Sequence, residues 1–73
     1  MKKFSCTKIS GGEDFIFATL IAEDEAAARE MAVAETNKKW PGQGGRPRHW
    51  TVAVLETEAE GPAQLIDCDR REA

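Results

Sequence analysis

The sequence predicts an α+β domain of order β-β-α-β-β, in which one helix packs on one face of a four-stranded, mainly antiparallel sheet. Three observations predict this fold. Up to Ala22 the chain is rich in apolar, aromatic and β-branched residues arranged as in strands. From Glu23 to about Lys39 the apolar spacing becomes helical, and near Trp50 it returns to a strand pattern. We expect residues 1–73 to form a single compact domain.

The first two strands are expected at about residues 3–9 and 14–22. The first alternates around Phe4 and Cys6, and the glycines of segment 10–13 permit the positive φ angles of a tight hairpin turn. The second strand is apolar on both faces. Such a strand either has both faces covered by other elements, or has one face covered and an exposed apolar second face that can bind another molecule. One helix covers only one face, so we expect apolar groups on the other.

The helix is expected at about residues 24–39. Asp24 suits the N-cap position, and Pro41 prevents the helix from continuing. At 100° per residue, the stripe that we expect against the sheet contains Ala27, Ala28, Met31 and Ala34. A second, weaker stripe contains Ala26, Val33 and Trp40.

Two further strands are expected at about residues 50–58 and 64–68, with residues 70–73 as a frayed tail. A chain of 73 residues has a small core. A dimer or a bound partner is therefore a plausible source of extra burial.

Composition excludes several classes of protein. Thirteen acidic and ten basic residues give a formal charge of −3, which is too mild to mark the whole surface for nucleic acid. No apolar run has the length of a signal peptide or a membrane span, so we expect a cytoplasmic protein. Cys6 and Cys68 are expected as thiols. A disulfide between them requires the first and last strands to be neighbours.

Few residues are suited to catalysis. His49 is the only histidine, and Ser5 and Ser10 are the only serines. The cysteines and the histidine also lack CxxC or HxxxH spacing. We expect no catalytic, cofactor-binding or metal-binding residues, and a protein that is not an enzyme.

The expected topology separates charge between the two ends of the domain. If strand two, the helix and strand three run up, down and up, the upper end collects acidic residues from two distant segments. These are Glu23, Asp24, Glu25, Glu56, Glu58 and Glu60. The lower end collects the basic residues Lys38, Lys39, Arg46 and Arg48.

Each charged group has a functional and a structural interpretation. The acidic end suits a basic partner surface, but acids also stabilise a helix N-terminus and protect a sheet edge. The glycine- and arginine-rich loop 42–48 suits a phosphate or a carboxylate, but it also suits a plain connector. Both alternatives remain open from the sequence.

Residues 15–31, FIFATLIAEDEAAAREM, show a strand that ends in an acidic cap and an alanine-rich helix. In this segment, and in its size and element order, the chain resembles small phage and mobile-element proteins of the anti-CRISPR type. It shares no motif that transfers functional residues. The resemblance implies an inhibitor that binds a larger nucleic-acid-handling complex, such as a CRISPR effector, and blocks its nucleic-acid site. The alternatives are a nucleic-acid-binding module that uses loop 42–48, and a small homodimeric structural or regulatory protein.

Overall fold

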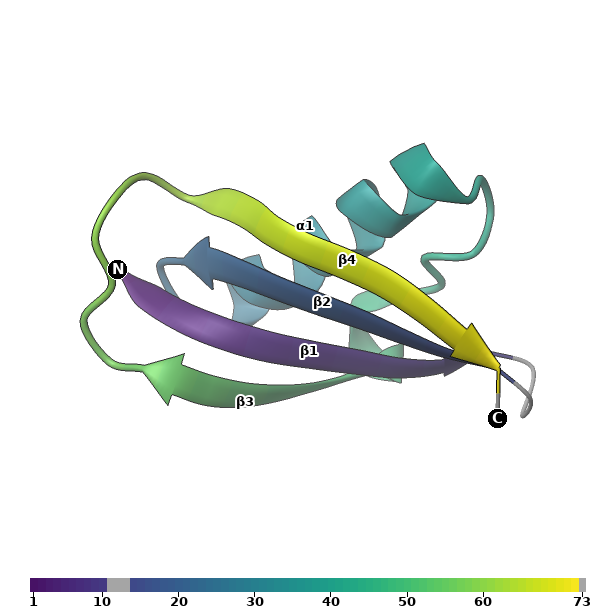
Figure 1. The fold of residues 1–73 in the computed structure, drawn as a ribbon, viewed down its shortest axis with the longest axis horizontal. Helices are drawn as coiled ribbons and strands as arrows, with labels where there is room; N and C mark the ends of the chain where they lie inside the picture. The colour runs from purple at the N-terminus through teal and green to yellow at the C-terminus, as the bar shows by residue number, and fades with distance from the viewer. Residues whose placement is uncertain (11–13, 73) are drawn as a thin grey trace.

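The computed structural model describes residues 1–10 and 14–72 and has the predicted order of elements (Figure 1). Strands β1 (Lys2–Ser10) and β2 (Asp14–Ala22) form the centre of the sheet. Strand β3 (Trp50–Glu56) pairs with β1, and β4 (Gln64–Glu72) pairs with β2. The strand order is β3-β1-β2-β4, and every neighbouring pair is antiparallel. The predicted fold class is confirmed. The predicted glycine turn falls on residues 11–13, which lie outside the described residues.

Helix α1 (Glu25–Lys39) lies behind the sheet in Figure 1 and covers one of its faces. Its start is fixed locally, because the Asp24 carboxylate accepts a hydrogen bond of 2.8 Å from the Ala27 N–H. The predicted N-cap is therefore confirmed. No helix in the described part of the chain is long and apolar enough to cross a bilayer.

The face of α1 that packs on the sheet matches the predicted stripe in part: Ala27, Ala28 and Met31 belong to it, but Ala34 does not. The buried residues Ala28, Ala32 and Thr36 repeat every four positions, whereas Ala34 is exposed. Three apolar residues of α1, together with the C-cap residue after it, lie partly buried around this central row: Ala27, Met31, Val33 and Trp40. The predicted stripe omitted both Ala32 and Thr36. Thr36 is polar and so gave no apolar signal, but its small side chain fits a close approach of helix and sheet.

The core lies between α1 and the inner face of the sheet. Its sheet residues are Phe4, Cys6, Ile16, Ala18, Leu20, Ala22, Trp50 and Cys68. Cys6 and Cys68 pair with Ala18 from opposite sides, so the whole of β2 separates them. Both cysteines are buried free thiols.

The last two strands differ from their predicted lengths. β3 ends at Glu56 rather than residue 58, after a bulge near Leu55 that shifts its register against β1. β4 continues to Glu72 instead of ending at residue 68, so the predicted tail is wrong up to that residue. The full length of β2 is available for pairing, and Arg70 donates to the Asp14 carboxylate across this pair at 3.0 Å (Nε to Oδ2).

Candidate partner-binding surfaces

The face of the sheet opposite α1 carries an apolar strip along β1 and β2. Side chains of alternate residues reach this face, which we call the helix-free face. Its principal members are Ser5, Thr7, Ile9, Phe15, Phe17, Thr19, Ile21, Thr51, Ala53, Asp67, Asp69 and Arg71. The rings of Phe15 and Phe17 stack with centroids 6.2 Å apart, and Ile9 is 61% exposed. The predicted apolar outer face is therefore present.

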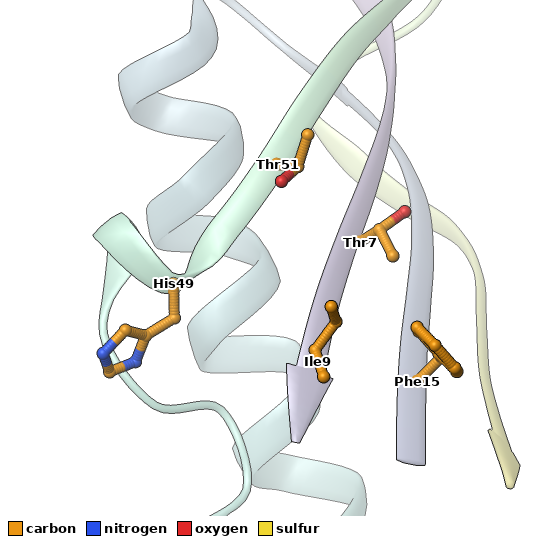
Figure 2. A pocket seen from close by; sticks show the side chains of 5 residues that line it. All are labelled: Thr7, Ile9, Phe15, His49 and Thr51. Carbon is orange, nitrogen blue, oxygen red and sulfur yellow. The ribbon is translucent and has the colours of Figure 1, made fainter. Parts of the chain in front are cut away.

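Two shallow hollows lie on the helix-free face. The larger has a volume of about 380 Å³ and is lined by Thr7, Ile9, Phe15, His49 and Thr51 (Figure 2). Its lining is mainly apolar, and Figure 2 shows the His49 ring turned away from Thr7 and Phe15. The His49 Nδ1 accepts a hydrogen bond of 3.0 Å from the Arg46 N–H. The imidazole thus has a structural role at the start of β3.

The second hollow, of about 200 Å³, lies between β2 and β4 and has a charged border. It is lined by Phe17, Asp67, Asp69 and Arg71. The Arg71 guanidinium lies 5.9 Å from the Phe17 ring centroid and donates to the Asp69 carboxylate at 3.0 Å. This hydrogen bond lowers the pKa of Asp69. An exposed aromatic ring beside carboxylates suits contact with a protein surface better than it suits catalysis.

The acidic residues named from the sequence lie at one end of the sheet, because β2 and β3 both finish there. Lys2 pairs with Ala22 and Lys3 pairs with Glu56, so the start of β1 lies between the two acidic segments. All six acidic side chains are exposed: Glu23, Asp24, Glu25, Glu56, Glu58 and Glu60. The two lysines were not predicted to lie at this end, since only the strand order places β1 between β2 and β3.

The basic residues named from the sequence do not form one surface. Lys39 Nζ donates to the Cys68 carbonyl at 2.8 Å and lies 5.4 Å from the Trp40 ring centroid, at the β4 edge. Lys38 forms an ion pair of 3.3 Å with Glu35 on the helix. Arg46 and Arg48 are exposed beside η1 (Pro47–His49), the 3-10 turn that leads into β3 at the opposite edge. Lys39 and the two arginines thus lie at opposite edges of the sheet, and Lys38 lies on the helix.

Loop 42–48 is tied to the body of the domain by its own backbone. The Gln43 N–H donates to the Trp40 carbonyl at 3.0 Å, and the Gly44 N–H donates to Asn37 Oδ1 at 2.8 Å. In turn, the Trp50 indole N–H donates to the Gly44 carbonyl at 2.9 Å. An anion site built from a loop needs free N–H groups that converge on the anion. These contacts favour the interpretation of the loop as a packed connector.

The two thiols are poorly suited to redox or metal chemistry. Burial raises the pKa of Cys6 to about 11, against a smaller opposite effect of Arg29. Burial also raises the pKa of Cys68, and the nearby Thr36 hydroxyl and Lys39 ammonium oppose this effect. The residues described here contain no group of three or more histidine, cysteine or acidic side chains able to hold a metal ion.

No protein-family model, curated protein or solved structure matches the chain. The surfaces themselves therefore carry the functional argument. The helix-free face offers exposed apolar side chains, and the adjoining acidic end offers a concentration of carboxylates. Together they join an apolar centre to a charged border, an arrangement that is also typical of protein interfaces.

Proposed function

We propose that this chain is a small non-enzymatic protein-binding module that docks through its helix-free face, with the acidic end steering the approach. The observation that carries the proposal is the partly exposed pair of stacked rings, Phe15 and Phe17, on the half of that face nearer the start of β2. In so small a protein, aromatic surface of this kind would otherwise serve the core. Covering it with a partner removes apolar area from water, which is the main driving force of association.

The charge around this face indicates the chemistry of the partner. Asp67 and Asp69 lie on β4 beside Phe17, and the acidic end adds the carboxylates of two loops. A basic protein surface complements this arrangement, and such complementarity mainly raises the association rate and selects the partner. A nucleic-acid-handling complex presents a basic surface of this type. An inhibitor that occupies the nucleic-acid site, as the anti-CRISPR resemblance implies, is the proposed biological role.

The proposal is tested by affinity capture from a host lysate with the tagged protein, followed by purification of the captured complex and titration. Phe17→Ser should weaken binding to the purified complex at all salt concentrations, because it removes apolar contact. Glu23→Lys with Glu56→Lys should slow association, with the largest effect at low salt. Glu30→Lys makes the same kind of charge reversal at an exposed helical position and should bind as the unmodified protein does.

Direct binding to labelled DNA and RNA separates this proposal from the nucleic-acid-binding alternative. Removing acidic charge from a nucleic-acid-binding protein raises its affinity for DNA or RNA. That affinity also falls steeply as the salt concentration rises. If Glu23→Lys with Glu56→Lys strengthens binding to either nucleic acid while Arg46→Ala and Arg48→Ala abolish it, the docking proposal is wrong. The function then moves to the arginines beside η1.

A further inference from the structure

The two edge strands of the sheet differ in how well they are protected. Along β4 the charged residues Asp67, Asp69, Arg70, Arg71 and Glu72 follow closely. Lys39 also donates to the Cys68 carbonyl on this strand. Charges and covered carbonyls are the usual means by which proteins prevent an edge strand from pairing with another chain.

Strand β3 is protected in this way only at its start, where Arg29 Nε donates to the Trp50 carbonyl at 3.3 Å and the Trp50 N–H donates to the Pro47 carbonyl. No charged residue occurs from Trp50 through Leu55, and the side chains of Val54 and Leu55 are 47% and 53% exposed. In Figure 1 β3 forms the lower margin of the sheet, and no described element is drawn beyond it. A bulge near Leu55 is its one irregularity. The unpaired backbone groups of such an edge are available to a further strand.

The segments on either side of β3 carry opposite charges. Arg46 and Arg48 precede the strand, and Glu58 and Glu60 follow it. When two copies of β3 pair antiparallel about Ala53, the basic segment of each copy lies alongside the acidic segment of the other. Arg46 and Arg48 of one copy thus lie near Glu58 and Glu60 of the other. A parallel arrangement places like charges together and is disfavoured.

We propose that two copies of this chain associate through their β3 edges and form a continuous eight-stranded antiparallel sheet. In the register centred on Ala53, Val52 of each copy lies opposite Val54 of the other, on the same face of the sheet. Cross-strand pairs of β-branched residues are favourable. By two-fold symmetry a basic segment meets an acidic segment at both ends of the paired strands.

This dimer goes beyond the proposed function, because it uses the edge of the sheet and leaves the helix-free face open. It shares Glu58 and Glu60 with the acidic end, whereas Glu23, Asp24 and Glu25 lie outside it. Both helix-free faces then lie on the same side of the extended sheet. The dimer would therefore present two docking surfaces to one partner, which raises avidity without new contacts. Self-association is measured in the purified protein alone, so either proposal can fail while the other stands.

The test combines charge reversal with mixing. The unmodified protein should sediment as a dimer at about 100 μM, since weak self-association depends on protomer concentration. Arg46→Glu with Arg48→Glu, and separately Glu58→Arg with Glu60→Arg, should each associate at least about tenfold more weakly, because like charges then meet at both ends. An equimolar mixture of the two variants should restore the dimer, since it restores every opposite pair.

Two further variants test whether the dimer interface lies at the β3 edge. Ala53→Lys places two lysines opposite one another at the symmetry axis and should give a monomer, while circular dichroism confirms that the variant is folded. Lys38→Glu reverses charge on the helix and should leave the dimer intact. A monomeric unmodified protein at this concentration overturns the proposal, as does a mixture that stays monomeric. A dimer that survives Ala53→Lys but is lost in Phe17→Ser overturns it too, and assigns the interface to the helix-free face.

Discussion

Replacement of Gly44 by alanine tests how the glycine-rich loop is attached to the domain. A Cβ at this position would lie 2.5 Å from the Val33 carbonyl oxygen and 2.8 Å from Asn37 Oδ1. The first of these atoms belongs to the helix backbone and cannot rotate away. The loop must therefore move outward, which strains two hydrogen bonds: Gly44 N–H to Asn37 Oδ1, and the Trp50 indole N–H to the Gly44 carbonyl.

The expected loss of stability follows from these contacts. Insertion of a methyl group into a packed site costs about 1–3 kcal/mol. Each weakened hydrogen bond costs about 1 kcal/mol. A total of about 3–5 kcal/mol corresponds to a fall in Tm of about 12–40 °C in a domain of this size. Because the total stability of a small domain is about 5–15 kcal/mol, the variant should still fold at low temperature.

Thermal unfolding of Gly44→Ala is followed by circular dichroism and by tryptophan fluorescence, which also reports the environment of Trp50. Gly42→Ala is the matched control, because that residue has φ +82° and its added Cβ would meet no atom within 4 Å. The control should cost only about 1–2 kcal/mol, the price of the left-handed conformation. If Gly44→Ala unfolds at the same temperature as the unmodified protein, the loop is not packed on the helix as described.

Two further predictions concern the core. Ala32→Asp should lower the free energy of unfolding by several kcal/mol because it buries an unpaired charge, whereas Ala34→Asp should change it by less than about 1 kcal/mol; equal urea midpoints for the two would contradict the assigned helix face. Stability should also decrease by up to about 2 kcal/mol as the pH rises from 9 toward 11. Over this range the Cys6 thiol ionises in the unfolded chain, at a pKa of 9.0, before it ionises in the folded one. Cys6→Ala should reduce this pH dependence in urea titrations, and an unchanged slope would count against the buried thiol.

The element order and the helix start were predictable because they depend on local chemistry. Asp24 caps α1 through a hydrogen bond to a residue three positions away, and such contacts leave a clear pattern in the sequence. The uncovered apolar face was predictable for a different reason. β2 is apolar on both sides, and one helix cannot cover both. The apolar character of the helix-free face was thus predictable without knowing which strands lie beside β2.

Contacts between distant residues required the tertiary structure. The length of β4 depends on pairing with β2 and on the bond between Arg70 and Asp14, 56 positions apart. A polar terminal segment gives no local sign of such pairing. Likewise, Thr36 faces the core because the axis of α1 is set by the whole sheet. The hydrophobic stripe of an isolated helix does not specify the rotation of the helix about its own axis to better than a few tens of degrees.

The sequence determined that acidic residues gather at one end, since strands that run in the same direction finish together. Only the strand order β3-β1-β2-β4 decided which other residues lie between these acidic segments. It placed Lys2 and Lys3 between the acidic segments, separated Cys6 from Cys68 by a full strand, and left β3 with its exposed edge. Strand order is a choice among pairings of similar local energy. It is settled by the packing of side chains far apart in the chain, which no single segment encodes.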